Sequence, residues 1–153
     1  MVPREHRNSE SRLAPRGIVL IADDHLDAAN SLAMRIELTG VDAYVAHDGL
    51  EAVELAHRLR PDLIFMDLSM PRLNGVEAAV RIRREPWGRD IVICALTALD
   101  DLSSRSATRA AGFDQHLVKP VCFSEIDALL PARTSTPPTP IRLRASGRSQ
   151  PDR

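Results

Sequence analysis

Residues 63–71 read LIFMDLSMP: a run of apolar residues ends in one carboxylate, Asp67, and Pro71 follows four residues later. Short apolar runs bounded by turn residues are typical of a strand that is buried on both faces, as in a parallel sheet. Such a strand places Asp67 at its carboxyl end, where open α/β sheets bind their ligands. A carboxylate in that position is costly to bury unless it meets a cation or a phosphoryl group. The other residues that the chain brings to Asp67 therefore determine its chemistry.

Apolar runs of the same kind recur along the chain, and helical patterns separate them. The expected strands are residues 17–22, 43–46, 63–67, 91–96 and 115–118. The expected helices are about 26–38, the stretch between Asp48 and Pro61, a stretch that begins at Asn74, the weakly apolar 103–111, and a short segment capped by Ser124 and ended by Pro131. Strands that alternate with helices at about 20–25 residues per unit predict a parallel α/β sheet with right-handed crossovers.

Two of these helices have sequence signals at their first turn. Asp48 is followed three residues later by Glu51, and Asn74 is followed three residues later by Glu77. This spacing predicts a capping box, in which each side chain bonds to the other residue's backbone N–H group.

The length of 153 residues suits one domain with a proper core and is short for two. We expect residues 17–130 to form the domain, residues 1–16 to be a disordered lead, and residues 131–153 to be a tail rich in Pro, Ser and Arg. No apolar run is long enough to span a membrane, and the first residues contain no signal-peptide core. The two cysteines form no disulfide framework. We therefore expect a cytoplasmic location.

The charges are distributed unevenly. Arg collects in residues 1–16 and 131–153, whereas residues 17–130 have an excess of Asp and Glu. An acidic body does not attract nucleic acid, so we expect no direct DNA binding. The residues after Leu130 are also too few for a helix-turn-helix domain. The absence of GxGxxG and GxxxxGK[ST] motifs disfavours a dinucleotide or P-loop site.

Five polar residues interrupt the apolar pattern at strand ends. Asp23 and Asp24 end the first strand, Asp67 the third, Thr97 the fourth and Lys119 the fifth. In a parallel sheet these ends share one rim. Three neighbouring carboxylates repel one another and need a cation, and their oxygen ligands suit Mg²⁺. Lys119, the only lysine in the chain, offers a mobile point charge that can follow a phosphoryl group.

The pattern resembles the receiver domain of bacterial two-component response regulators over residues 17–130. The motifs that carry the resemblance are IADD at 21–24, MDLSMPRLNG at 66–75, ALTA at 95–98 and AGFDQHLVKP at 111–120. The last motif is most similar to receivers of hybrid sensor kinases. The resemblance implies a doubly wound, five-stranded parallel sheet of the flavodoxin-like (βα)5 type, with strand order 2-1-3-4-5.

The resemblance also implies roles for single residues. Asp67 is the phosphoacceptor, and Lys119 neutralises charge on the transferred phosphoryl group. Asp24 and Asp67 bind Mg²⁺ directly, Asp23 acts largely through water, and the backbone carbonyl of Ser69 completes the protein ligands. The protein then catalyses its own phosphorylation and dephosphorylation and is not a conventional enzyme.

The switch follows from the same resemblance. The hydroxyl of Thr97 is expected to bond to the phosphorylated Asp67 and to pull in the loop that follows. The family usually has Tyr or Phe at the position of His116, which turns into the vacated space. His116 is therefore either the switch residue or a half-exposed strand residue without that role. The Lys119-Pro120 peptide bond is expected to be cis, and the short last helix departs from the family's full-length one.

The implied partner is a histidine kinase or a histidine phosphotransfer protein, and a phosphorylation-dependent dimer stays open. Two alternatives remain. One is a Mg²⁺-dependent phosphatase of the haloacid-dehalogenase type, which places its nucleophilic Asp on the first strand and its acid pair last, the reverse of the order here. The other is a degenerate receiver that acts only as a scaffold. His25, beside the acid pair, is either a surface neighbour or a metal ligand.

Overall fold

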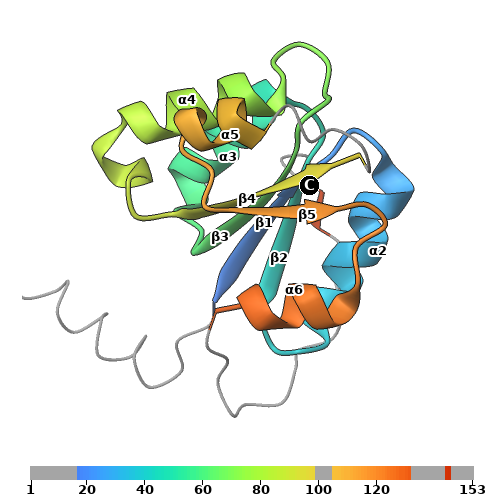
Figure 1. Ribbon diagram of the computed structural model, residues 1–153. Helices are drawn as coiled ribbons and strands as arrows, with labels where there is room; N and C mark the ends of the chain where they lie inside the picture. Colours follow the sequence, from blue (N-terminus) through green and yellow to red (C-terminus); the bar gives the residue numbers. More distant parts are fainter. Residues whose placement is uncertain (1–16, 99–104, 132–143, 146–153) are drawn as a thin grey trace, which may run out of the picture.

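The computed structural model describes residues 17–98, 105–131 and 144–145. Strands and helices alternate along this part of the chain (Figure 1). In chain order the elements are β1 (Ile18–Ala22), α2 (Leu26–Glu37), β2 (Asp42–Ala46), α3 (Gly49–Leu59), β3 (Leu63–Asp67), α4 (Gly75–Arg84), the 3₁₀ turn η1 (Pro86–Gly88), β4 (Val92–Thr97), α5 (Arg105–Ala111), β5 (Gln115–Val118), α6 (Phe123–Leu129) and β6 (Arg144–Ala145).

The strands form one parallel sheet in the order β5-β4-β3-β1-β2-β6. The order of the first five strands is the predicted 2-1-3-4-5. The sixth strand was not predicted: Arg144 and Ala145 pair in parallel with Tyr44 and Val45 on the outer side of β2. Two residues show no strand periodicity in the sequence, so this pairing could be seen only in three dimensions.

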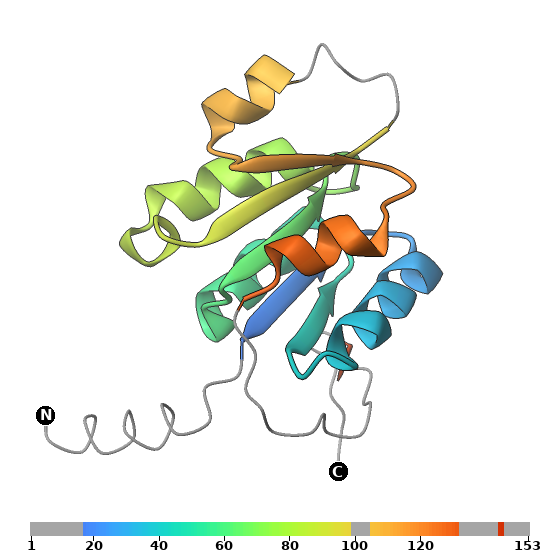
Figure 2. The same ribbon diagram turned by 60° about the horizontal axis from the view of Figure 1, so that its bottom comes forward.

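Helices cover both faces of the sheet. Figures 1 and 2 show α2 and α6 on one face and α3, α4 and α5 on the other. The alternation of side chains along β1 matches this arrangement, since Val19 and Ile21 pack with α2 and α6 while Leu20 and Ala22 pack toward α3, α4 and α5. All of β3 is buried, as its apolar run predicts.

Of the two predicted capping boxes, the one at Asn74 is complete, and the one at Asp48 forms only its first hydrogen bond. The Asn74 side chain accepts a hydrogen bond from the Glu77 amide, and the Glu77 carboxylate accepts one from the Asn74 amide. The Asp48 side chain accepts from the Glu51 amide, whereas the Glu51 carboxylate accepts from the amide one residue before Asp48. Both helices therefore begin where the sequence indicates.

The predicted cap of the last helix is wrong. The N-cap residue of α6 is Cys122 and not Ser124. The Cys122 amide donates to the carboxylate of Glu125 at 3.4 Å, so the acidic residue three positions later sets the start of the helix. Ser124 lies within the first turn, with its hydroxyl 3.3 Å from the Cys122 sulfur.

Gly75 allows α4 to begin directly against the end of β3. A Cβ atom on Gly75 would lie 2.3 Å from the backbone oxygen of Asp67 and 2.9 Å from the Cα of Leu68. The Gly75 amide donates to the Leu68 carbonyl at 3.0 Å. Only glycine permits so close an approach, and this contact fixes the strand end that carries Asp67.

Candidate functional site

The predicted site residues meet at the carboxyl ends of the strands. Asp24, Asp67, Thr97 and Lys119 line one depression of about 580 Å³, which Ser69 also borders. Asp23 contacts this group from the side, because its Oδ2 lies 3.5 Å from the Lys119 Nζ. The parallel sheet thus brings together residues that are far apart in the sequence, as the strand-end pattern predicts.

Asp67 is the buried carboxylate at the centre of this depression, and only 5% of its surface is exposed. Its Oδ1 accepts a hydrogen bond from the Ser69 amide at 3.2 Å. Burial raises the pKa of Asp67 above the ordinary value for aspartate, and the neighbouring Asp23 adds to this rise. Lys119 and the Ser69 amide oppose it, yet the net direction is upward. The side chain therefore gains from a cation beyond the one lysine.

Lys119 extends its ammonium group over two carboxylates. The Nζ lies 3.4 Å from Oδ2 of Asp67 and 3.5 Å from Oδ2 of Asp23. Its backbone is fixed by a hydrogen bond from the Lys119 amide to the Thr97 carbonyl at 2.8 Å. The peptide bond to Pro120 is cis, which confirms the expectation.

The acid group forms a cluster with the chemistry of a divalent metal site. One side-chain oxygen from each of Asp23, Asp24 and Asp67, and one nitrogen of His25, all lie within 4.8 Å of one another. Buried Asp67 and Asp23 next to the more exposed Asp24 supply hard oxygen donors on a face that water can reach. This donor set fits a magnesium-type ion that keeps part of its water. The His25 ring belongs to the same group.

Thr97 and His116 lie in different surroundings. Thr97 is 5% exposed, and its hydroxyl donates to the carbonyl of Ala98 at 3.4 Å. His116 does not line the depression: its Nε2 is in hydrogen-bond contact with the hydroxyl of Thr108, and its ring centroid is 6.5 Å from that of Phe113.

Charges near His116 act against its protonation. Burial lowers the pKa of His116, and the nearby Arg105 and Arg109 lower it further. Thr108, which is fully buried, was missed as its partner. The sequence offers as a signal the spacing of three residues between Thr108 and Ala111, and the structure shows that these two residues form the buried side of α5.

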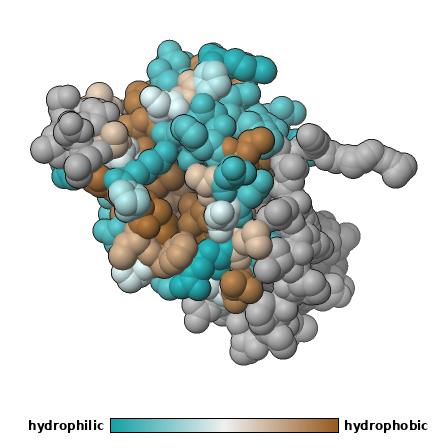
Figure 3. Space-filling view, turned by 90° about the vertical axis from the view of Figure 1, so that its right-hand side faces the viewer, coloured by the Kyte–Doolittle hydropathy of each residue, from teal (hydrophilic) through white to brown (hydrophobic). Residues whose placement is uncertain are grey.

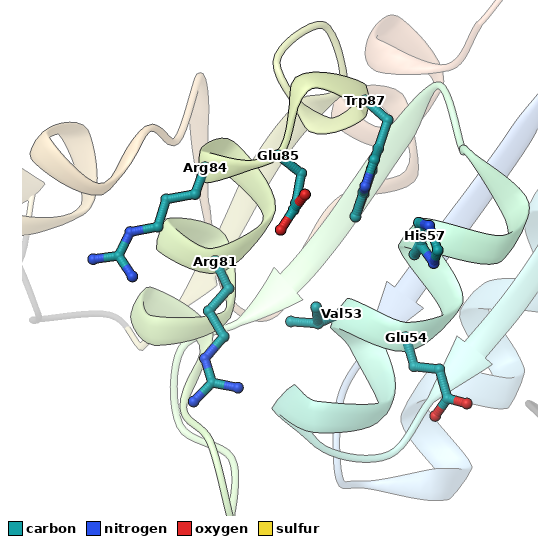
Figure 4. Close-up of a pocket in the computed structure, with 7 residues that line it drawn as sticks. All are labelled: Val53, Glu54, His57, Arg81, Arg84, Glu85 and Trp87. Carbon is teal, nitrogen blue, oxygen red and sulfur yellow. The ribbon is translucent and has the colours of Figure 1, made fainter.

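A second depression, of about 660 Å³, lies between α3 and α4. Figure 4 shows its lining, with the Trp87 ring next to that of His57 and Arg81 extending from α4. The two ring centroids are 5.1 Å apart, and the Arg60 guanidinium lies 5.2 Å from the Trp87 ring. None of the predicted site residues lines it. Acidic and basic side chains surround the adjacent rings of His57 and Trp87 in this depression.

A five-unit parallel α/β fold, with three aspartates, a threonine and a lysine at one rim, defines the receiver class of signalling domains. A family model described as the response regulator receiver domain matches residues 19–130. The chain belongs to this family.

The curated relatives are response regulators. Response regulator MprA of Mycobacterium ulcerans is 38% identical over 114 residues, which cover 74% of this chain and 48% of the relative. MprA of Mycobacterium tuberculosis is 37% identical over the same length. The chain thus spans about half the length of the curated relatives it matches.

Solved structures share the fold. The chemotaxis protein CheY4 of Vibrio cholerae has a TM-score of 0.70 at 26% identity, covering 74% of this chain and 96% of that one. The receiver domain of Ssk1 from Saccharomyces cerevisiae, solved with the histidine phosphotransfer protein Ypd1, has a TM-score of 0.68 at 28% identity, covering 74% and 86%. Among the described residues, no helix has both the length and the apolar character needed to cross a bilayer.

Proposed function

We propose that this chain performs the phosphoacceptor step of a two-component phosphorelay and that Asp67 is the residue that becomes phosphorylated. The observation that carries the proposal is the pairing of a buried carboxylate with a lysine 3.4 Å away, inside an acidic cluster that water can reach. Phosphoryl transfer needs mainly positioning and charge neutralisation, and these residues supply both.

The transfer can be written in terms of the chain's own residues. An Asp67 carboxylate oxygen bonds to phosphorus while the bond from phosphorus to the partner's histidine nitrogen breaks, and that nitrogen keeps the electron pair. The Lys119 ammonium neutralises charge that grows on the phosphoryl oxygens. Asp23, Asp24, Asp67 and the Ser69 carbonyl would hold Mg²⁺, which supplies further charge neutralisation when bound. The protein thereby acts on itself, and it is not proposed to turn over substrates as a conventional enzyme does.

The switch is proposed to start at Thr97. Its hydroxyl now donates to a neighbouring carbonyl at 3.4 Å, a long hydrogen bond that a phosphoryl oxygen on Asp67 can replace. His116 would then leave Thr108 and turn toward the space that Thr97 vacates. In the alternative, His116 stays against Thr108 in both states. A structure with a phosphate mimic bound separates the two by the direction of the His116 ring.

The proposed partner is a protein that carries a phosphorylated histidine, either a kinase or a phosphotransfer protein. An apolar groove of about 600 Å³ runs between α2 and the start of α6, directly beside the Asp67 depression. His25, Leu96, Ala98 and Lys119 line both. Figure 3 faces the side of the molecule where α2 lies and shows apolar residues gathered around a hollow. Phe123, which is 48% exposed, lines the groove and gives a partner an apolar contact close to the reacting atoms.

Three finer expectations stay predictions. They are the cytoplasmic location, the lack of direct DNA binding, and a dimer that forms on phosphorylation. The acidic charge of residues 17–130 supports the second of these. The third requires a measurement of mass in both phosphorylation states.

The direct test is labelling with acetyl phosphate and Mg²⁺, followed on a gel that retards phosphoproteins. The wild type should give a phosphoform, and Asp67→Asn should give none. Asp90→Asn is the matched control, because Asp90 is exposed and precedes β4 at the opposite rim of the sheet; it should label like the wild type. Labelling of Asp67→Asn would remove the assignment, and an unlabelled wild type would favour the scaffold. Hydrolysis of a generic phosphatase substrate would favour the phosphatase.

A further inference from the structure

His25 faces the acid pair and not its own helix. It is the N-cap residue of α2, yet its side chain makes no capping hydrogen bond. Its backbone amide donates to Oδ1 of Asp23 at 2.9 Å, which orients the residue toward the acidic cluster. The ring nitrogen Nδ1 lies 3.3 Å from Oδ1 of Asp23 and 3.4 Å from Oδ1 of Asp24. The His25 side chain is 73% exposed, and yet its ring contacts two carboxylates.

The Asp23 contact at 3.3 Å is a long hydrogen bond, and both distances are also compatible with shared metal ligation. The nitrogen and oxygen of an N–H···O hydrogen bond are usually about 2.7–3.2 Å apart. Two neighbouring ligands of an octahedral ion, each about 2.1 Å from the metal, are about 3 Å apart. The contacts of His25 Nδ1 with Asp23 and Asp24 are longer than the first value and close to the second. One ion can therefore meet both oxygens and the nitrogen after small side-chain movements.

The nitrogen changes which ion the cluster favours. Carboxylate, carbonyl and water oxygens suit Mg²⁺, whereas imidazole nitrogen adds affinity for transition metals, in an order that rises from Mn²⁺ toward Ni²⁺ and Cu²⁺. Resting on the metal site of the proposed function, we propose that His25 is an additional nitrogen ligand, which gives this site a preference for divalent transition-metal ions over Mg²⁺.

The test measures binding itself, by calorimetric titration of tag-free protein with MgCl₂ and, separately, with NiCl₂, at a pH of about 8 where imidazole is mostly neutral. His25→Ala should weaken Ni²⁺ binding about tenfold or more and change Mg²⁺ binding by less than about twofold. His57→Ala is the matched control, since this exposed histidine on α3 lines the depression between α3 and α4, to which none of the acid cluster belongs. It should change neither affinity.

Two results would overturn the proposal. If His25→Ala changes the affinities for Ni²⁺ and Mg²⁺ by the same factor, the ring acts only through its charge or hydrogen bonds. No change in either ion means that it stays a surface neighbour. Because His25 is largely exposed, the variant should fold, and its circular dichroism spectrum checks this.

A separate control distinguishes failure of this inference from failure of the proposed function. If the wild type binds Mg²⁺ and becomes phosphorylated on Asp67 while His25→Ala keeps its Ni²⁺ affinity, only the role of His25 is lost. If the wild type binds neither ion and is not labelled, the metal site itself is wrong, and the inference falls with it.

Discussion

The ammonium group of Lys119 lies 3.4 Å from Oδ2 of Asp67, across the ends of two strands that have β4 between them. Neither residue is close to the other in sequence, and only the parallel register of β3, β4 and β5 brings them together. This ion pair places the proposed phosphoacceptor next to a charge that phosphoryl transfer would require.

Replacing Lys119 should slow phosphorylation of Asp67. Lys119→Met removes the only lysine charge, so the rate of labelling by acetyl phosphate should fall by about 10²-fold or more, the usual loss when one stabilising donor is removed. Lys119→Arg keeps a charge but changes its shape and reach, and should recover only part of the rate. The measurement is the initial labelling rate at saturating Mg²⁺. A Lys119→Met rate within threefold of the wild type would contradict the assignment.

Asp67→Asn should stabilise the metal-free protein at neutral pH. Burial raises the pKa of Asp67, so the folded state binds the proton more tightly than the unfolded state does. The stability linked to this proton is present below the unfolded pKa and is lost as pH rises through the folded pKa. The advantage of the variant should thus grow with rising pH and then level off. Urea unfolding in the presence of a chelator, from about pH 4 to about pH 8, measures the difference.

With Mg²⁺ present, the wild type should become more stable than Asp67→Asn. A ligand that binds only the folded state adds about 2.7 kcal/mol at a concentration of 100 Kd. The wild type should gain this stability, while Asp67→Asn, which lacks one ligand charge, should gain much less. Equal gains in the two proteins would place the ion elsewhere.

Gly75→Ala should damage both the fold and the site. The added Cβ would meet the Asp67 carbonyl oxygen at 2.3 Å, and overpacking of this kind costs about 1–3 kcal/mol. Metal affinity should fall as well, because the strand end that carries Asp67 must move. Gly40→Ala is the comparison: its Cβ would meet nothing within 4 Å, but its φ of +94° is strained for alanine. It should cost about 1 kcal/mol and leave metal affinity intact.

The free energy of unfolding should fall in mild acid because of His116. Its pKa is lowered by burial and then by Arg105 and Arg109, so the unfolded chain takes up the proton first. The stability linked to neutral His116 is present above the unfolded pKa of about 6.5 and is lost as pH falls from there through the lowered folded value. His116→Phe keeps a ring and removes this titration. Unfolding free energies at about pH 7.5 and pH 5 should differ less in His116→Phe than in the wild type. His57→Phe, at an exposed site, should behave like the wild type.

Phe123→Ser should affect phosphorylation by a partner protein but not phosphorylation by acetyl phosphate. Loss of an apolar contact in the groove should slow transfer from a phosphorylated histidine phosphotransfer protein about tenfold, and labelling by acetyl phosphate should stay the same. Val92→Ser, at a residue that is 38% exposed at the start of β4, is the control and should affect neither reaction. Equal slowing of both reactions would indicate damage to the site and not to docking.

The strand pattern made much of this structure predictable. The bounds of β3 agree with the prediction because a polar residue ends a fully apolar run, and the start of α4 agrees because Asn74 and Glu77 form a complete local signal. The site was predictable for the same reason, since its residues stand at strand ends.

What escaped prediction depends on how one element packs on the next. Thr108 and His116 are only eight residues apart, but their pairing requires α5 to lie over β5. The sequence placed His25 beside the acid pair and left open whether its ring turns toward the two carboxylates. The cap at Cys122 was missed because cysteine is an unusual N-cap residue and Ser124 is a common type. Part of the segment expected as helix 103–111, residues 103 and 104, lies outside the described residues.

The short strand β6 has a consequence for association between molecules. Unpaired backbone groups on an edge strand invite another chain to extend the sheet. At Tyr44 and Val45 that position is already taken by Arg144 and Ala145 of the same chain. A strand from another molecule can pair with Tyr44 and Val45 only if it displaces Arg144 and Ala145. This segment therefore hinders intermolecular sheet extension at β2.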